Sequence, residues 1–346
     1  MSTYALLLAP SANRVYADAA TRLAQAELAA FAESGVLDAA LSDIAEARIG
    51  GVPYATFRAS ALSERDLRYL SNLSAAYALF TLVEGELLRP VALRPLAHYD
   101  DDLITIPKYA GKTNEQFTRL LLNVTLLASA AAPHLLDRRL VVLDPLCGRG
   151  TTLNQALMYG YDGIGVELDG KDVDAYAAFL RTWLKRKRLK HTADLIPVRR
   201  DRRVAARRFE VELAPTKDAH RAGATQRVTV LHADTTQARD FLRASCADVI
   251  VADAPYGVAH GSRTRETGLT RGPLALLAAA LPGWVELLRP GGALGLAWNV
   301  HVADRAEAAR TLADAGLDPV DTPAYRAFEH RVDQAITRDI LVARKP

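Results

Sequence analysis

The chain has 346 residues, 50% of them hydrophobic, so it can bury a large core and is long for a single domain. No apolar run approaches the ~20 residues of a membrane span, and the first residues lack the basic start of a signal peptide. The only cysteines are Cys147 and Cys246, which excludes a disulfide framework or a cysteine zinc site, and the histidines have no metal-ligand spacing. We therefore expect two domains, a cytoplasmic location and no bound metal.

The net charge of +3 hides an uneven distribution. Residues 181–227 contain 15 Lys or Arg and 5 Asp or Glu, which leaves the rest of the chain acidic. A concentrated basic segment on an acidic protein is typical of contact with a phosphate backbone. A solvated charged insertion would have the same composition, so both interpretations stay open.

Residues 1–100 predict a small α+β domain. Strands are predicted at 4–8 and 51–58, and helices at 21–33 and 63–82. This region has no catalytic constellation of its own. The polar residues 97–102 predict a linker, and 114–128 predict an amphipathic helix that leads into the next domain.

The rest of the chain alternates strand and helix. The strands are predicted at 140–144, 163–168, 228–232, 248–252, 293–298 and 339–343. The helices are predicted at 151–159, 171–188, 273–288 and 303–315. This alternation indicates an α/β fold, in which a mainly parallel sheet is covered by helices on both faces.

The basic segment interrupts this alternation. About 40 residues separate the helix at 171–188 from the third strand of the sheet, where a few would suffice. Residues 209–213 and 227–231 alternate like paired strands. We expect a basic insertion at about 185–227, formed as a hairpin that projects from one edge of the sheet.

Residues 144–150 lie at the carboxyl end of the first strand, where an open parallel sheet binds its ligands. Gly148 and Gly150 remove side chains at a point where a ligand must approach the backbone closely. Glu167 ends the next strand, close to the ~20-residue offset at which an acidic residue meets ribose hydroxyls. The pattern predicts a site for a nucleoside cofactor.

The residues favour S-adenosylmethionine over a nicotinamide cofactor. A nicotinamide site usually has a third glycine where this chain has Leu153, and the Asp144 carboxylate suits a cationic cofactor better than a pyrophosphate. Asp234 follows the third strand, where we expect contact with the adenine, although it could equally cap the next helix. Cys147 is expected to pack in the turn, since no basic partner would activate its thiol.

Gly111-Lys112-Thr113 has the appearance of the end of a phosphate-binding P-loop. That motif requires a glycine five residues before Gly111, where this chain has Ile106. We therefore expect no nucleotide triphosphatase.

Residues 253–257 follow the fourth strand, beside the predicted cofactor. A nucleobase amine is a poor nucleophile because its lone pair is delocalised into the ring. Asp253 can accept one of its hydrogen bonds, and the Ala254 carbonyl can accept the other, held extended by Pro255. Tyr256 can stack the base, a contact worth ~1–3 kcal/mol, and Gly257 leaves room for it. A turn after a strand is weak evidence alone, but its place in this sheet makes it a strong signal.

Two motifs carry a family resemblance. The first reads Asp-Pro-Leu-Cys-Gly-Arg-Gly-Thr at 144–151, and the second reads Asp-Ala-Pro-Tyr-Gly at 253–257. They resemble Asp-Pro-Phe-Cys-Gly-Ser-Gly-Thr and Asp-Pro-Pro-Tyr-Gly of the class I methyltransferases that modify exocyclic amines of nucleic acids. Ala254 replaces a proline but keeps the accepting carbonyl, and Arg149 replaces a small residue, where it faces substrate phosphate or solvent.

With its small N-terminal domain, the chain is most similar to the tRNA guanine N2-methyltransferases that have a ferredoxin-like/THUMP N-terminal half. The resemblance covers roughly residues 105–346 and implies a Rossmann-like sheet. We accordingly expect an N-terminal domain at 1–100 that binds RNA, a linker and helix at 101–130, and a methyltransferase domain at 131–346.

The expected activity is methyl transfer from S-adenosylmethionine to guanine N2 in tRNA. In the basic insertion, Arg186 and Arg188 are candidate RNA contacts. Three alternatives stay open: a DNA adenine or cytosine amino-methyltransferase, an inactive RNA-binding protein that retains the cofactor, and a small-molecule methyltransferase. The oligomeric state cannot be predicted.

Overall fold

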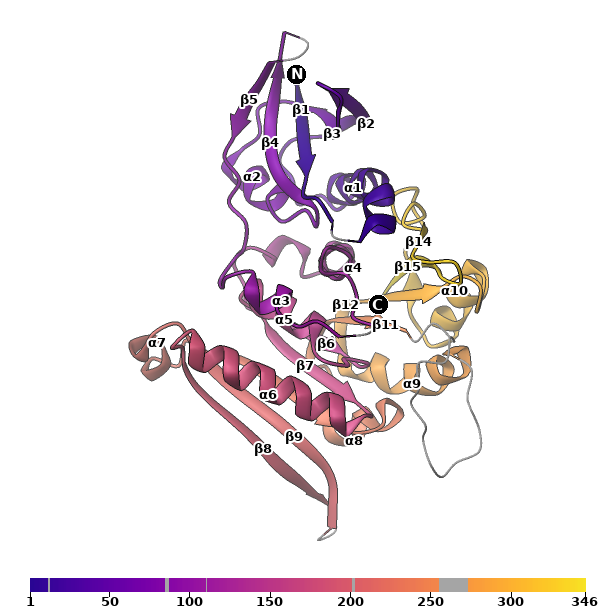
Figure 1. The fold of residues 1–346 in the computed structure, drawn as a ribbon. Helices are drawn as coiled ribbons and strands as arrows, with labels where there is room; N and C mark the ends of the chain where they lie inside the picture. Colours follow the sequence, from indigo (N-terminus) through magenta and orange to yellow (C-terminus); the bar gives the residue numbers. More distant parts are fainter. Residues whose placement is uncertain (12, 85–86, 110, 201–202, 255–272) are drawn as a thin grey trace.

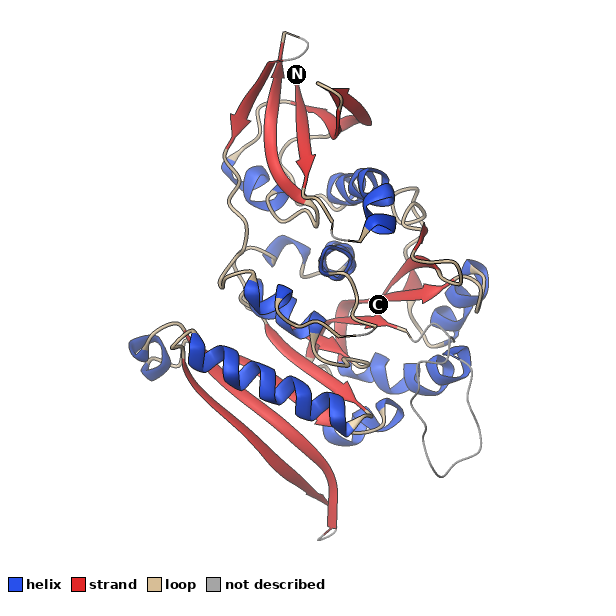
Figure 2. Cartoon of the chain, in the orientation of Figure 1, coloured by secondary structure: helices blue, strands red, loops and turns tan. Residues whose placement is uncertain are grey.

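The structure, a computed structural model, describes residues 1–346 apart from 12, 85–86, 110, 201–202 and 255–272. Helices and strands alternate over most of these residues and build two separate sheets (Figure 2). This confirms the predicted fold class, an α/β protein with a Rossmann-like sheet, a small N-terminal α+β unit and an inserted hairpin.

The first sheet has five antiparallel strands in the order β2-β3-β1-β4-β5 (Figure 1). The strands are β1 (Ser2–Leu8), β2 (Ser42–Ile49), β3 (Val52–Ala59), β4 (Ala76–Val83) and β5 (Leu87–Val91). Helix α1 (Arg14–Glu33) packs against β2 and β3, and α2 (Glu64–Leu70) precedes β4. The order β1-α1-β2-β3-α2-β4, with β1 between β3 and β4, is the ferredoxin-like arrangement.

The helix predicted over residues 63–82 is wrong beyond its first two turns. Ser63 and Asp66 form a capping box that starts α2, but the helix ends at Leu70. Residues 76–83 form β4 instead, because their aromatic and β-branched side chains pair with β1 and β5. Strands β2 and β5 were not predicted, since an edge strand buries few side chains and leaves a weak pattern.

The second sheet has ten strands in the order β13-β15-β12-β11-β6-β7-β10-β9-β8, and β14 pairs with β15. The strands of its parallel centre are β6 (Val141–Asp144), β7 (Asp162–Glu167), β10 (Gln226–His232), β11 (Ala247–Asp253) and β12 (Leu288–Asn299). The antiparallel strands are β8 (Lys190–Arg200), β9 (Arg203–Ala214), β13 (Asp318–Pro319), β14 (His330–Arg331) and β15 (Thr337–Arg344). After β6, the strands β7 and β10 are added on one side of it and β11 and β12 on the other, so the strand order reverses between β6 and β11. A parallel sheet binds its ligand at this point, which places the crevice at the carboxyl ends of β6 and β11.

Helices cover both faces of the second sheet, as the alternation predicts. The longer ones are α4 (Glu115–Ala128), α5 (Thr151–Met158), α6 (Gly170–Arg186), α9 (Pro273–Leu287) and α10 (Arg305–Asp314). The short ones are α3 (Asp102–Thr105), α7 (Lys217–Arg221), α8 (Ala238–Phe241) and the 3₁₀ turns η1 (Ala132–His134) and η2 (Thr235–Gln237). In β11, Val249 and Val251 face the α4 side, and Ile250 and Ala252 face the α9 side.

The basic insertion forms a hairpin at the edge of the second sheet (Figure 1). The predicted pairing of residues 209–213 with 227–231 is confirmed, because β9 runs antiparallel to β10. The hairpin partner of β9 is β8, which was not predicted. Its charged and polar side chains gave no clear alternation. It pairs with β9 along its whole length, and α6 packs against it, with Arg181 Nε donating to the Ala193 carbonyl at 3.0 Å.

Helix α4 joins the two sheets, since one buried apolar cluster contains its residues together with side chains from both. Polar bonds reinforce this junction. The buried Glu27 carboxylate of α1 accepts hydrogen bonds from the Ser74 backbone N–H and from Asn123 Nδ2 of α4, at 2.9 and 2.7 Å. Burial raises the pKa of Glu27, and these hydrogen bonds oppose the shift. At the start of α4, Gln116 donates to the Ala9 carbonyl at 3.0 Å.

Candidate functional site

A cavity of about 610 Å³ lies at the carboxyl ends of β6 and β11. It is bounded by the loop before α4, the β6–α5 turn, the end of β11 and the segment that leads into β15. Because these segments converge there from distant parts of the chain, the cavity holds both sequence motifs. We call the part around the β6–α5 turn the cofactor half, and the part around Asp253 the acceptor half.

In the cofactor half, the β6–α5 turn places Asp144 at the wall of the cavity, where the residue is 4% exposed. Its Oδ1 accepts a hydrogen bond from the Leu146 backbone N–H at 3.0 Å. Gly148 and Gly150 have φ values of +50° and +77°, which L-residues rarely adopt. A Cβ on Gly150 would lie 2.4 Å from the Tyr176 ring, so this turn requires glycine there.

Burial raises the pKa of Asp144 from its ordinary 3.8 to about 7. Hydrogen bonds from Thr152 and Leu146 oppose this shift, while the negative charges of Asp253 and Glu167 add to it. The carboxyl group is therefore poised to ionise when a cation enters the cavity.

The other predicted cofactor residues are Glu167, Asp234 and Cys147, and they make different contacts. Glu167 accepts hydrogen bonds from the backbone N–H groups of Gly148 and Asp169 at 2.8 and 2.7 Å. Asp234 caps η2 by accepting from Thr236, which is the alternative that its sequence position allowed. Neither side chain is among the described residues that line the cavity. Cys147 is buried and lines the cavity, and burial raises the pKa of its thiol.

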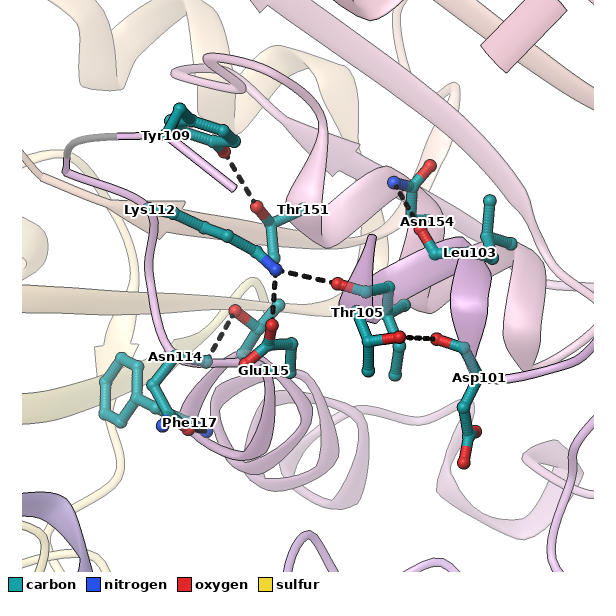
Figure 3. Close-up of polar contacts among 12 residues, drawn as sticks. Asp101, Leu103, Thr105, Tyr109, Lys112, Asn114, Glu115, Phe117, Thr151 and Asn154 are labelled. Carbon is teal, nitrogen blue, oxygen red and sulfur yellow. Dashed lines mark hydrogen bonds and ion pairs between the residues drawn. The ribbon is translucent and has the colours of Figure 1, made fainter. Parts of the chain in front are cut away.

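Arg149 also lines the cofactor half. Its Nε donates to Asp172 at 2.7 Å, and its guanidinium lies 4.9 Å from the centre of the Tyr109 ring. Figure 3 shows the Tyr109 hydroxyl bonded to Thr151 Oγ1, at 3.0 Å. The loop before α4 is thereby tied to the first residue of α5.

The P-loop-like Lys112 lies in this same loop and lines the cavity. Its Nζ donates to the Ile104 carbonyl at 2.7 Å and to Glu115 (Figure 3). Because these two groups bind its ammonium, Lys112 has a structural role and holds the loop in place.

In the acceptor half, Asp253 ends β11, and its side chain is 21% exposed at the cavity wall. Thr113 Oγ1 donates to Asp253 Oδ2 at 2.6 Å, and Arg338 Nη2 lies 4.0 Å from the same oxygen. Ala254 is buried, and its backbone N–H donates to the Ala297 carbonyl of β12 at 2.9 Å. The three following predicted site residues, Pro255, Tyr256 and Gly257, lie outside the described residues.

Sequence reasoning missed several residues of the acceptor half. Thr113, Phe117 and Arg338 line the cavity, together with Val332, Asp333 and Ile336 of the segment before β15. One signal could have revealed Arg338. It starts an antiparallel last strand, and the start of such a strand lies at the carboxyl edge of its parallel neighbours.

The candidate RNA contacts lie away from this cavity. Arg186 donates to Asp102 at 2.9 Å, and the adjacent Lys187 bonds Asp100 and Asp102. Arg188 follows α6 with a left-handed φ of +56°. The Asp102 contacts attach the end of α6 to the segment that leaves the first sheet.

The cofactor half fits a cationic ligand that has no phosphate. It presents the carboxyl groups of Asp144 and Asp172 to the cavity, Asp172 being paired with Arg149, and Asp253 lies beyond them. S-adenosylmethionine carries a sulfonium and an amine, which such a set of carboxylates attracts. The volume of about 610 Å³ lies within the range of small-molecule sites.

Comparison with known proteins agrees with this chemistry. Residues 135–289 match the UPF0020 family, described as an RMKL-like methyltransferase domain. The match spans less than half of the chain, from just before β6 to the end of α9. Residues 135–289 therefore carry a methyltransferase domain, and S-adenosylmethionine is its cofactor.

Solved structures show only distant similarity, and no curated protein matches the chain. TrmN from Thermus thermophilus aligns over 100% of both chains with 15% identity and a TM-score of 0.44. A precorrin-6y C5,15-methyltransferase from Geobacter metallireducens aligns over 73% of this chain and 99% of its own, with 15% identity and a TM-score of 0.39. A 1,6-didemethyltoxoflavin-N1-methyltransferase from Burkholderia thailandensis, solved with S-adenosylhomocysteine, aligns over 63% and 76%, with 18% identity and a TM-score of 0.33. Similarities this low carry no argument about the substrate.

None of the helices in the described part of the chain has the length and apolar character needed to cross a membrane. No group of three or more His, Cys, Asp or Glu side chains within it could hold a metal ion.

Proposed function

We propose that this methyltransferase modifies an exocyclic amine of a nucleobase in RNA, with guanine N2 in tRNA as the favoured target. One observation carries the proposal: a single cavity joins the Asp144 turn to Asp253 and Ala254. The resemblance of residues 253–257 to the amine-binding loop of nucleic-acid methyltransferases supports the choice of an amine.

The chemistry requires positioning more than a strong base. When bound, S-adenosylmethionine supplies a methyl group on a sulfonium, which the amine nitrogen takes up in line with the departing sulfur. Asp253 and the Ala254 carbonyl would accept the amine hydrogens and turn the nitrogen lone pair toward the methyl group. Because the amine proton can leave after transfer, Asp253 acts as an acceptor that orients the amine. Tyr256 would stack a base flipped out of its helix.

The hairpin supports an RNA substrate. Arg199 and Arg203 are exposed near its tip. Arg200 and Arg207 form ion pairs with Asp240 and Asp174 at 3.6 and 3.1 Å, and such exposed pairs are weak enough to be exchanged for phosphate. The hairpin would bind the RNA backbone while the base reaches the cavity.

The first sheet would contribute differently. Residues 1–100 contain 8 Arg and no Lys, against 11 Asp or Glu, so this unit is acidic. If it binds RNA, as the resemblance implies, it would do so by shape and hydroxyl contacts rather than by phosphate charge.

The decisive experiment measures transfer of labelled methyl from S-adenosylmethionine to bulk tRNA, ribosomal RNA and DNA, followed by nucleoside mass spectrometry. A methylguanosine in tRNA that disappears with Asp253→Ala is the expected result. Methyladenine or methylcytosine in DNA would instead establish the DNA enzyme. Cofactor binding without transfer to any polymer would refute the proposal and leave a small-molecule or inactive protein.

A second experiment tests the hairpin. The double variant Arg199→Ala with Arg203→Ala should reduce the slope of log affinity for tRNA against log salt concentration by about 1–2, because two phosphate contacts are lost. Arg310→Ala, an exposed arginine of α10, is the control and should leave the slope unchanged. An unaltered slope in the double variant would exclude the tip of the hairpin from the RNA interface.

A further inference from the structure

We propose that Thr113 and Arg338 are positioning residues that hold the Asp253 carboxylate in the orientation needed to accept the substrate amine. Neither residue belongs to the two sequence motifs, and both line the same cavity as Asp253. The inference rests on the proposed function, because it assigns these side chains a role in amine methylation.

Thr113 provides the shorter contact. Its hydroxyl donates to Asp253 Oδ2 at 2.6 Å, the short distance expected when a hydroxyl bonds a carboxylate. The residue immediately precedes Asn114, which caps α4 by accepting from the Phe117 backbone N–H at 3.1 Å. Figure 3 shows this cap at the start of the helix. The Thr113 backbone is thus fixed by a helix end, so its hydroxyl has little freedom to leave Asp253.

Arg338 approaches the same oxygen from β15, which is separated from β11 by β12. Its side chain is only 6% exposed, and its Nη2 lies 4.0 Å from Asp253 Oδ2. The guanidinium lies 4.1 Å from the centre of the Phe117 ring, which restricts its rotamers. Buried arginine beside a carboxylate fixes both charge and orientation more firmly than an exposed pair does.

The two contacts converge on Oδ2 from the loop before α4 and from β15, so the plane of the Asp253 carboxylate is set by two elements other than its own strand. A carboxylate that rotates freely could accept hydrogen bonds from the amine in several orientations. Only one of these orientations aligns the nitrogen lone pair with the methyl group. Since a misplacement of about 1 Å can cost on the order of 10²-fold in rate, this alignment controls turnover rather than binding.

The test compares Thr113→Val with Thr113→Ser. Valine keeps the size and branching of threonine but cannot donate, so kcat for methyl transfer to tRNA should fall about tenfold, while the Kd for S-adenosylmethionine changes by less than about twofold. Serine retains the hydroxyl and should restore kcat to within about threefold of the wild type. Thr311→Val, whose lost hydroxyl bonds Glu307 on α10, is the matched control.

Arg338 is tested in the same assay. Arg338→Met should lower kcat about tenfold, and Arg338→Lys should recover part of the loss because it restores the charge without the planar donor. Thermal unfolding of each variant separates a loss of folding from a loss of alignment.

The outcomes separate this inference from the proposed function. A wild-type protein that transfers no methyl group to any RNA removes both. An active wild type with unchanged kcat in Thr113→Val removes the inference alone. Equal losses in Thr113→Val and Thr113→Ser, accompanied by a lower unfolding temperature, would show that Thr113 serves folding only.

Discussion

The two halves of the cavity are built in different ways. The cofactor half is formed mostly by one short run of chain, the β6–α5 turn between Asp144 and Thr151. The acceptor half is assembled from segments that are far apart in the sequence, with Thr113, Asp253 and Arg338 on three different parts of the fold. A local turn can keep its shape when the surroundings change, whereas the acceptor half depends on how three elements pack.

This difference predicts that substitutions in the two halves fail in different ways. Changes in the cofactor half should weaken binding of S-adenosylmethionine or the stability of the turn. Changes in the acceptor half should lower turnover and leave cofactor affinity intact.

The largest effect is expected for Asp253→Asn. The amide keeps the size of the side chain but loses the negative charge that holds the amine hydrogens, so kcat should fall about 10²-fold or more. Binding of S-adenosylmethionine, measured by calorimetry, should stay near the wild-type value. A comparable loss of cofactor affinity would break the division of the cavity into two halves.

Gly150→Ala should have the next largest effect, which is a loss of stability. The residue has φ +77°, and the new Cβ would overlap the Tyr176 ring at 2.4 Å, so the free energy of unfolding should fall by about 1–3 kcal/mol. Thermal unfolding measures this loss. Gly223→Ala is a matched control with φ +72° and open space around the Cβ, so it isolates the backbone cost. Equal losses in both variants would show that Tyr176 yields without strain.

Asp144→Asn should weaken cofactor binding. Removing a buried carboxylate beside a cationic ligand should raise the Kd for S-adenosylmethionine about tenfold, with kcat at saturating cofactor little changed. Isothermal titration gives the Kd and steady-state assays give kcat. If kcat fell and the Kd did not, Asp144 would belong to the acceptor half.

The smallest effect is a pH dependence of cofactor binding. Because the pKa of Asp144 is raised to about 7, its carboxyl is partly protonated at neutral pH, and a cation must displace that proton. The Kd should therefore rise about fivefold between pH 8 and pH 6, and Asp144→Asn should abolish the change. The stability of the protein without cofactor has the opposite pH dependence. The contribution of this carboxyl to the free energy of unfolding is fully present below its ordinary pKa of 3.8 and is lost as the pH rises through about 7.

What could be predicted from sequence follows the same division. The parallel strands at the centre of the second sheet are buried on both faces, so their apolar runs were visible, and the glycines of the β6–α5 turn marked where a ligand approaches. Asp253 was found because it follows one of these strands. Thr113 and Arg338 were not found, because a single threonine and one arginine among many carry no local pattern.

The edges of the sheets were the least predictable parts. Strand β8 is ordered by pairing with β9 and by packing of Ala193 and Leu195, and β4 contains alanine and leucine residues that fit a helix equally well. For β4 the deciding interaction is its pairing with β1, which is distant in sequence, so propensity gave no answer.

The sharing of α4 between the two sheets has a consequence for how this protein could evolve or be engineered. The Glu27 carboxylate of α1 and the Asn72 carbonyl accept hydrogen bonds from Asn123, and the Ala9 carbonyl accepts one from Gln116, so the N-terminal unit fixes the same helix whose first turn follows Thr113. The N-terminal unit therefore holds α4, and with it the acceptor half, in place, and it is not an exchangeable module. A chimera that replaces it with an unrelated domain would retain the site of the methyl donor and lose the alignment of Asp253, unless the new domain also reproduced the contacts to α4.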